Sequence, residues 1–364
     1  MKRRLSKIWI GIAAAAVVAV VAFALGSGGG KMTDGRPVVK IGLIFPLTGN
    51  SAHLGHAMKG AAEIAVLHAN KNPGNRYEYR LITEDSRLQM PVAANIANKM
   101  VSVDRVDAML SFSAEVVNVV SAIAERGRVI HFGISVDRAG AKGRYNFINW
   151  TMPEATTQKM TEIIKARGFK NVAIISLNQS GSLANSEMLR DKLSAAGIKN
   201  SLHVFNGDVR DFKSDIARMR ASGVDIYVLR LFDPMMSIFI RQLREAGDTA
   251  TITSIEMFNT IADPSIIEGL WFVDTATAEG AISDEIMRHS KSEVSWGIGQ
   301  IYDNVMMIVH AFEVAPDRAG AIDVLVGLRE FDGVVGRLVQ DKDGIFHSSA
   351  TLKEIRGGRQ VIIK

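Results

Sequence analysis

The sequence predicts an α/β protein with two doubly wound parallel sheets, each carrying helices on both faces. Short apolar runs typical of buried strands alternate with amphipathic helical segments, and this alternation occurs twice in succession. The chain has 364 residues, of which 47% are hydrophobic and 22% charged, a globular composition in a length that favours more than one domain. After about residue 290 the rhythm changes to two longer helices and a strand-like tail.

The first series of elements contains four strands and three helices. Residues 38–45 form a continuous apolar run between Pro37 and Pro46, as expected for a strand buried on both faces. Pro91 opens one helix at a position where proline is tolerated. The expected order is strand 38–45, helix 55–70, strand 79–84, helix 91–102, strand 107–110, helix 116–126 and strand 129–132.

The second series repeats the pattern without repeating the sequence. Gly168 and Gly197 follow two of its helices and are typical helix stops. The expected elements are helix 154–167, strand 172–176, helix 183–196, strand 201–205, helix 212–221, strand 225–231, helix 234–246 and strands 251–255 and 270–274. Two helices at 292–314 and 319–331 and a strand-like tail at 333–364 complete the chain.

The N-terminus has the features of an export signal. A basic segment, 1–7, precedes the apolar run 8–25, and Ala22-Phe23-Ala24 is a small-x-small cleavage pattern. We therefore expect a signal peptide at 1–24 and a flexible linker at 25–37. The alternative is an uncleaved signal anchor, because 18 apolar residues are just long enough to span a bilayer. Both interpretations place the rest of the chain outside the cytoplasm.

Charge and composition exclude several classes of function. The net charge is +5, but without residues 1–24 the chain has 39 basic against 38 acidic residues, so we expect no nucleic-acid partner. The absence of cysteine excludes disulfides, thiolate metal sites and a cysteine nucleophile. The eight histidines show no metal-ligand spacing, and no Gly-x-Ser-x-Gly or phosphate-loop motif occurs. We expect neither metal nor cofactor, and no enzymatic activity.

Parallel sheets bind ligands beyond the carboxyl ends of their strands, where loops and helix N-termini present free N–H groups. The loops at these positions are 111–115, 135–137, 177–182, 231–233 and 256–259.

Several motifs resemble the leucine/isoleucine/valine-binding protein family, the type I periplasmic solute-binding proteins of ABC transporters. The opening Lys40-Ile41-Gly42-Leu43-Ile44-Phe45-Pro46-Leu47-Thr48-Gly49 is followed by Gly55 and Gly60-Ala61-Ala62. Further matches follow in order: Glu84-Asp85-Ser86, Ser111-Phe112-Ser113-Ala114, Gly207-Asp208-Val209-Arg210-Asp211-Phe212, Asp225-Ile226-Tyr227, Glu268-Gly269 and Tyr302-Asp303. No single motif is specific; their order and spacing across about 38–364 carry the resemblance.

The resemblance implies two lobes joined by a three-strand hinge. The expected lobes are 38–149 with 276–348 and 150–275 with 349–364. It also implies an extracytoplasmic receptor that closes on an amino acid or related small polar metabolite and docks on a membrane ABC permease. We expect a monomer. The alternative is a membrane-associated sensor of the same fold that reports amides, amino acids or other metabolites to a signalling partner.

The first lobe is expected to contribute two loops to the ligand site. In the family, the loop Ser111, Phe112, Ser113 and Ala114 holds the ligand's carboxylate, although Ser111 and Ser113 could also simply cap the following helix. The second loop is Ser135, Val136 and Asp137, where relatives commonly have hydroxyl or small side chains. Asp137 departs from this pattern and either receives an ammonium group or is a solvated loop acid.

The second lobe is expected to contribute Gly181, Phe232 and Glu256. Glu256 resembles the family's acid that pairs with the ligand's α-ammonium, and the alternative is a surface acid. Arg230 is unusual in an apolar strand, where it forms an ion pair at the lobe edge or faces the cleft and favours an anion. Leu54 and the segment Ser180-Gly181-Ser182 lack aromatic residues that relatives have there, which weakens leucine specificity.

Overall fold

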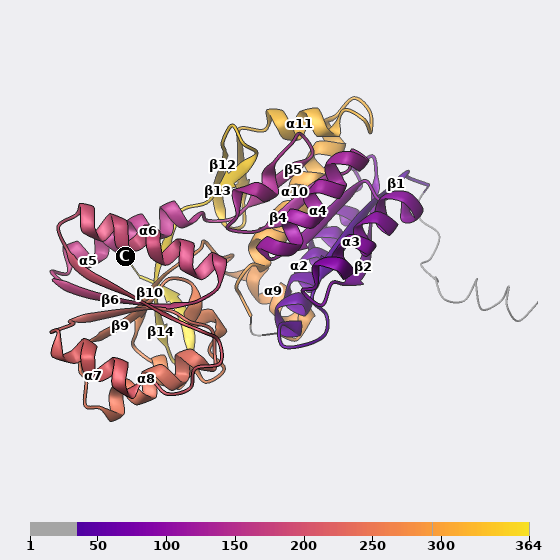
Figure 1. Ribbon diagram of the computed structural model, residues 1–364. Helices are drawn as coiled ribbons and strands as arrows, with labels where there is room; N and C mark the ends of the chain where they lie inside the picture. Colours follow the sequence, from indigo (N-terminus) through magenta and orange to yellow (C-terminus); the bar gives the residue numbers. More distant parts are fainter. Residues whose placement is uncertain (1–34, 293, 364) are drawn as a thin grey trace, which may run out of the picture.

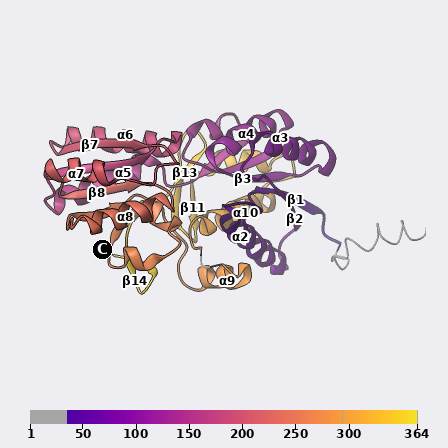
Figure 2. The same ribbon diagram turned by 60° about the horizontal axis from the view of Figure 1, so that its bottom comes forward.

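The computed structural model describes residues 35–292 and 294–363. The expected signal peptide, 1–24, and most of the linker lie outside the described residues. The described chain forms two lobes that lie side by side and meet at a narrow waist (Figures 1 and 2). Each lobe has a central sheet with helices on both faces, as the sequence predicts.

The first lobe contains an eight-stranded sheet in the order β11-β12-β13-β5-β4-β3-β1-β2. Its six strands from β13 to β2 are parallel, and β11 and β12 are antiparallel additions at one edge. The strands are β1 (Val38–Phe45), β2 (Glu78–Asp85), β3 (Ala108–Phe112), β4 (Ile130–Ile134), β5 (Asn146–Asn149), β11 (Glu330–Gly333), β12 (Gly336–Gln340) and β13 (Ile345–His347).

Two separate apolar clusters cover the two faces of this sheet. Ile41 and Leu43 of β1 face the cluster formed with α2 and α10, and their neighbour Ile44 faces the cluster formed with α3 and α4. This alternation is the side-chain period of a strand buried on both faces. The helical segments are α2 (Ala52–Lys71), α3 (Met90–Lys99), a π-helical turn (Met100–Asp104), α4 (Ala114–Gly127), a 3-10 turn (Arg138–Ala141), α9 (Ala281–Ser290), α10 (Ile298–Val314) and α11 (Ala321–Gly327).

The second lobe contains a parallel sheet, β7-β6-β8-β9, and an antiparallel sheet, β10-β14-β15. A parallel β-bridge between Ile255 and Val273 joins the two sheets into one continuous layer. The strands are β6 (Asn171–Leu177), β7 (Lys199–Phe205), β8 (Ile226–Arg230), β9 (Thr251–Ser254), β10 (Trp271–Asp274), β14 (Thr351–Arg356) and β15 (Arg359–Ile362). The helical segments are α5 (Pro153–Ala166), α6 (Ser180–Ala195), α7 (Lys213–Ala221), α8 (Met235–Glu245) and two 3-10 turns (Met257–Thr260 and Pro264–Ile267).

The chain passes between the lobes three times, after β5, β10 and β13. One hydroxyl ties these three crossings together: Thr151 Oγ1 lies 2.5 Å from Ser348 Oγ and 2.7 Å from Thr275 Oγ1. Gln300 Nε2 then donates to the carbonyl of Ala276 at 2.5 Å. These buried bonds fix the three segments as one connection between the lobes, which is the arrangement of a hinge.

The predicted elements agree with the structure except near residue 146 and after residue 276. The first strand, β1, has the predicted bounds, but the short strand β5 and the helix α9 are not predicted. The prediction of a helix at 292–314 is wrong at its start, because Gly297 has a φ of +78° and α10 begins at Ile298. The helix expected at 319–331 ends at Gly327, because β11 pairs with β12 from Glu330 onward.

Candidate functional site

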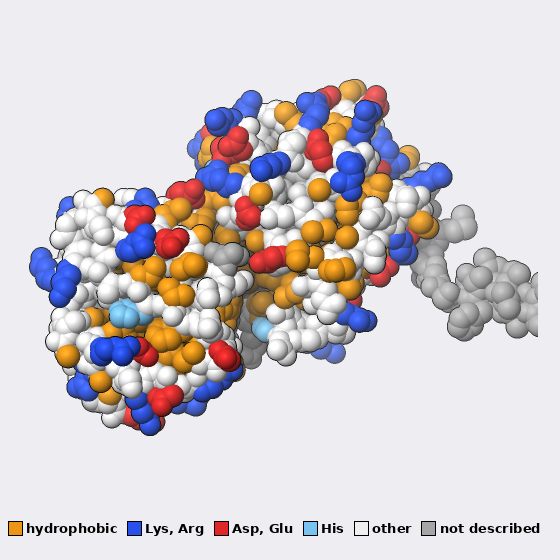
Figure 3. All heavy atoms as spheres, viewed as in Figure 1, with side chains coloured by type: hydrophobic (Ala, Val, Ile, Leu, Met, Phe, Trp, Pro, Cys, Tyr) orange, Lys and Arg blue, Asp and Glu red, His pale blue; other side chains and the backbone are white. Residues whose placement is uncertain are grey.

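The predicted loops of the two lobes meet at the waist, where the space-filling view shows the surface hollowed (Figure 3). In the first lobe, Phe112 at the end of β3 pairs with Ile134 at the end of β4, so the loops that follow these strands are neighbours. A methyl group on Gly181 of the second lobe would lie 3.6 Å from Val136 Cγ2 of the first. The start of α6 therefore lies against the β4 loop across the boundary between the lobes.

Ser111 has an internal hydrogen-bond partner. Its side chain is fully buried, and its Oγ lies 2.8 Å from His131 Nε2. Asn146 Oδ1 lies 2.9 Å from His131 Nδ1, while Asn146 Nδ2 donates to the carbonyl of Lys142 at 2.8 Å. Because the Asn146 oxygen must accept, His131 is protonated on Nδ1 and accepts the Ser111 hydroxyl proton on Nε2. The hydroxyl of Ser111 is thus committed within the sheet, and a ligand contact from Ser111 stays a prediction.

The Ser111–His131–Asn146 chain has the order of a nucleophile, a base and an orienting group. All three side chains are shut off from solvent, with exposed fractions of 0%, 0% and 1%. Their hydrogen bonds to one another and to the backbone of Lys142 all lie within the first lobe. The chain is therefore a structural hydrogen-bond network that joins β3, β4 and β5.

Protonation of His131 should destabilise the fold in acid. Burial lowers the pKa of His131 to about 4, below its ordinary value of 6.5. The unfolded chain therefore binds more protons between pH 6.5 and 4, and stability is lost as the pH falls through this window. The free energy of unfolding should fall between pH 7 and pH 4 by about 3 kcal/mol more in the native chain than in His131→Gln. Urea denaturation of both proteins at the two pH values tests this, and equal losses would contradict it.

Ser113 and Glu256 share an unusual backbone conformation at the ends of strands. Their φ angles are +78° and +65°, in the region that favours glycine. Of the five other non-glycine residues with positive φ in the described chain, Arg105, Arg128 and Lys291 are left-handed caps that end helical segments, and Arg87 and Leu88 lie in the turn between β2 and α3. Ser113 and Glu256 have no such role, one preceding α4 and the other following β9. Strain of this kind persists where the surrounding structure enforces it and is concentrated at functional sites.

The hydroxyl of Ser113 is not used to cap the helix that follows it, and its contact with a ligand stays a prediction. Ser113 is the N-cap residue of α4, but its side chain makes no capping hydrogen bond. Simple N-capping by this side chain is therefore not what the structure shows. Ala114 begins α4 directly behind it and is half-buried.

The side chain of Asp137 is occupied by contacts within the first lobe. Its carboxylate accepts a hydrogen bond from Ala139 N at 2.9 Å, and this bond caps the short 3-10 turn. It also accepts a hydrogen bond from Asn118 Nδ2 at 2.6 Å. Asp137 N in turn donates to Ser135 Oγ at 2.9 Å. The Asp137 carboxylate thus already holds two internal partners and is half-buried, and its contact with a ligand stays a prediction. Phe232, at the matching edge of the second lobe, is 37% exposed.

Glu256 is buried beside a cation. Arg230 ends β8 and Glu256 follows β9, and the parallel pairing of these strands brings the two side chains together. Arg230 Nη1 lies 3.9 Å from Glu256 Oε2, and the same nitrogen donates to the carbonyl of Ile255. Both residues are only 3% exposed, so the alternative of a surface acid at Glu256 is wrong. For Arg230 the structure supports an ion pair at the lobe edge.

Burial shifts the pKa of both members of this pair toward the neutral form. It raises the pKa of Glu256 to about 7, with Asp274 adding to the rise, while Arg230, a hydrogen bond from Trp150 and Lys353 oppose it. Burial also lowers the pKa of the Arg230 guanidinium, against the opposing effect of Glu256. The carboxyl group of Glu256 is therefore only partly ionised near neutral pH.

Two tryptophans that sequence reasoning did not select complete the site. Trp150, in the first crossing, lies 4.9 Å from Trp296 between ring centroids, and Trp296 lies 5.8 Å from Phe112, both edge to face. Trp150 directly follows the unpredicted strand β5, and Trp296 lies in the segment wrongly predicted as helix. Neither residue lies in or next to a predicted ligand loop, so the sequence offered no signal for them beyond their large aromatic side chains.

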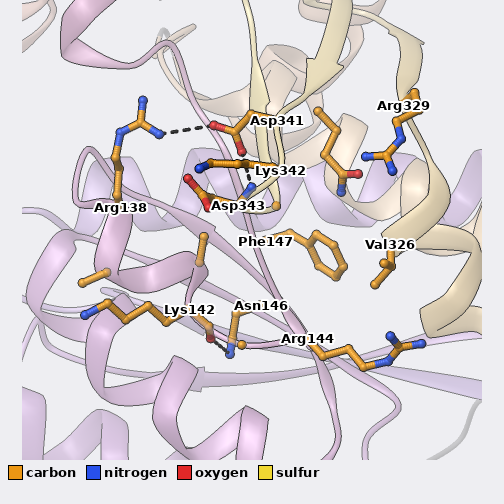
Figure 4. Close-up of a pocket in the computed structure, with 15 residues that line it drawn as sticks. Arg138, Lys142, Arg144, Asn146, Phe147, Val326, Arg329, Asp341, Lys342 and Asp343 are labelled. Carbon is orange, nitrogen blue, oxygen red and sulfur yellow. Dashed lines mark hydrogen bonds and ion pairs between the residues drawn. The ribbon is translucent and has the colours of Figure 1, made fainter.

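A separate cavity of about 870 Å³ lies in the first lobe at the amino-terminal ends of β5 and β13 (Figure 4). Figure 4 shows the Phe147 ring between cationic side chains. These cations are Arg138, Lys142, Arg144, Arg329 and Lys342. They are exposed, so salt screens their fields. Because parallel sheets bind ligands at the opposite, carboxyl ends of their strands, we assign the ligand site to the waist and not to this cavity.

Two features of residues 35–292 and 294–363 bear on other functions. Within these ranges no three or more histidine or acidic side chains gather where they could hold a metal ion. No helix in the same ranges is both long and apolar enough to cross a membrane.

Comparison with known proteins identifies the family. The model of the periplasmic binding protein family matches residues 38–359. The chain belongs to this family. An amino acid binding protein of Pseudomonas aeruginosa is 23% identical over 268 residues, which cover 69% of this chain and 71% of that protein. The resemblance to leucine/isoleucine/valine-binding proteins predicted from the sequence is confirmed.

Solved structures of this periplasmic binding protein family have the same fold. The isoleucine complex of a branched-chain amino acid transporter substrate-binding protein from Streptococcus pneumoniae superposes with a TM-score of 0.79, at 18% identity over 90% of this chain and 99% of that one. The solute-binding protein of an ABC transporter from Rhodopseudomonas palustris, in complex with 3,4-dihydroxybenzoic acid, gives 0.76 at 12% identity over 90% and 96%. The predicted two-lobed fold is therefore confirmed.

Proposed function

We propose that this periplasmic binding protein is the extracytoplasmic receptor of an ABC transporter. It binds an amino acid or related small polar metabolite between its lobes, closes by hinge motion and docks on a membrane permease. The main support is the position of Ser113 and Glu256. These two strained residues lie at the carboxyl ends of strands in different lobes, on either side of the hinge through Thr151.

The ligand class has two precedents among the relatives. The Streptococcus protein is described with isoleucine and the Rhodopseudomonas protein with a dihydroxybenzoic acid. A ligand stabilises the closed state only through contacts that it lacks in the open state. Binding should therefore both stabilise the fold and make the molecule more compact.

A ligand panel on the full-length chain in mild detergent tests this function. The panel contains α-amino acids, amides, aliphatic acids and aromatic acids. A true ligand at about 100 times its dissociation constant should add about 2.7 kcal/mol, a rise of several degrees in Tm. The same ligand should reduce the radius of gyration measured by X-ray scattering. A panel in which no compound changes either quantity contradicts the proposal.

A further inference from the structure

The carboxylate that could receive a ligand ammonium already has a cation. Arg230 and Glu256 are buried together at the ends of β8 and β9, with 3.9 Å between Nη1 and Oε2. A second buried pair lies nearby, with Lys353 Nζ 2.7 Å from Asp274 Oδ2. The four side chains that form these pairs are balanced, with two cations and two carboxylates. An ammonium ligand would add a third cation to this cluster, and an uncompensated buried charge is strongly destabilising.

Of the buried side-chain atoms that lack partners in the described residues, those of Arg230 and Trp296 belong to groups that only donate, and the others are amide atoms of Asn118, Asn149, Asn185, Gln300 and Asn304. Arg230 Nε and Trp296 Nε1 are both buried, and neither has a partner among residues 35–292 and 294–363. Neither group can accept a hydrogen bond. A buried donor without a partner costs about 1–3 kcal/mol, so each such group needs an acceptor. Carboxylate and carbonyl oxygens supply that acceptor, and an ammonium group does not.

These two donors lie in different lobes and are linked by contacts through the site. Arg230 lies beside Glu256, which interacts with Trp150, and Trp150 packs on Trp296. Trp296 in turn packs on Phe112. The contacts from one donor to the other therefore pass through the carboxyl group of Glu256 and the ring of Trp150. A ligand that satisfies both donors would hold the lobes together and place an apolar body against the rings.

The protonation of Glu256 favours an anion over a cation. With its pKa raised to about 7, Glu256 is readily protonated. Once it is neutral, Arg230 has a positive charge that a ligand carboxylate can balance, whereas a ligand ammonium has lost its partner. The other charges that act on Glu256 are Asp274 on β10 and Lys353 on β14, and they remain paired with each other.

We infer that the ligand of this site is a carboxylic acid with an apolar or aromatic body and no α-ammonium group, held through its oxygens by Arg230 and Trp296. The inference rests on the proposed function and specifies its ligand class. Arg230 is the residue that determines this specificity.

Matched pairs of ligands test the inference on the native full-length chain. Phenylalanine and 3-phenylpropanoate differ only in the α-ammonium group, as do leucine and 4-methylpentanoate. In each pair the acid without the amine should bind at least ten times more tightly, by calorimetry and by the rise in Tm. Equal or tighter binding of the amino acids overturns the inference and leaves the proposed function intact. If neither these acids nor any other compound raises Tm or compacts the chain, both fall.

Variants of Arg230 test whether this residue causes the preference for acids without an amine. Arg230→Met should weaken acid binding at least thirty-fold and leave amino acid binding unchanged or stronger, because Glu256 loses its internal cation. Arg230→Lys keeps the charge but loses the Nε donor and should weaken acid binding at least five-fold. Arg241→Met removes an exposed arginine of the same lobe and should change neither affinity. If Arg230→Met does not fold, Arg230→Lys and the matched ligands on the native chain still test the inference. An acid affinity that is unchanged in Arg230→Lys overturns the role of Arg230.

Discussion

Replacement of Lys353 by methionine is expected to lower the free energy of unfolding by about 3–5 kcal/mol. Lys353 Nζ lies 2.7 Å from Asp274 Oδ2 and 2.9 Å from Thr277 Oγ1, and both members of the ion pair are almost fully buried. Methionine fills a similar volume, so the loss arises from the carboxylate of Asp274 that remains buried without its cation. Urea denaturation monitored by circular dichroism measures the change.

Two further variants distinguish the cost of leaving the Asp274 carboxylate buried without its cation from the cost of removing any lysine side chain. The double variant Lys353→Met with Asp274→Asn removes both charges and should recover at least about 2 kcal/mol of the loss. Lys99→Met removes an exposed lysine that pairs with Glu84 at 2.8 Å, and it should cost less than about 1 kcal/mol. A double variant as unstable as Lys353→Met would show that packing, not the unpaired charge, causes the loss.

The fold could be predicted wherever burial produces a local pattern. The strand β1 was predicted with its observed bounds, because an apolar run between two prolines has few alternatives. The strand β5 could not be predicted, since two of its four residues are Asn146 and Asn149. These polar side chains are buried because they form hydrogen bonds with other parts of the chain. Asn149 Nδ2 donates to Asn304 Oδ1 at 2.9 Å, 155 residues along the chain.

The start of α10 shows the opposite error. Val294 and Trp296 pack against the core of the first lobe, so the apolar pattern of the helix extends toward the N-terminus. The chain is not helical there, because Gly297 adopts a left-handed conformation and directs Trp296 toward Trp150. The spacing of apolar residues shows which residues are buried, but it does not show whether their backbone is helical.

For the site, the sequence could identify loops but not the partners of their side chains. Arg230 and Glu256 are 26 residues apart, and their contact depends on the register between β8 and β9. Ser111 and Asp137 were selected from their positions after strands, yet their side chains bond to His131 and Asn118 within the first lobe. Loop position follows from topology, whereas the direction of a side chain follows from tertiary packing.

Gly55 marks the second position at which one substitution should have a large effect. It lies in the first turn of α2, where this helix packs against the chain leaving β1. A Cβ atom on Gly55 would lie 1.8 Å from the carbonyl oxygen of Pro46 and 2.6 Å from its carbonyl carbon. Both are backbone atoms, so no side-chain rotation can relieve the overlap, and either α2 or the end of β1 must move.

Gly55→Ala is therefore expected to lower the free energy of unfolding by about 3 kcal/mol or more, the upper range for overpacking. Gly327→Ala is the matched control, because Gly327 is also helical and a Cβ there meets no atom within 4 Å. Alanine's higher helix propensity should leave that variant unchanged or about 1 kcal/mol more stable. Urea denaturation of the two variants measures the difference. If Gly55→Ala were as stable as Gly327→Ala, the approach of α2 to Pro46 could not be a constraint on the fold.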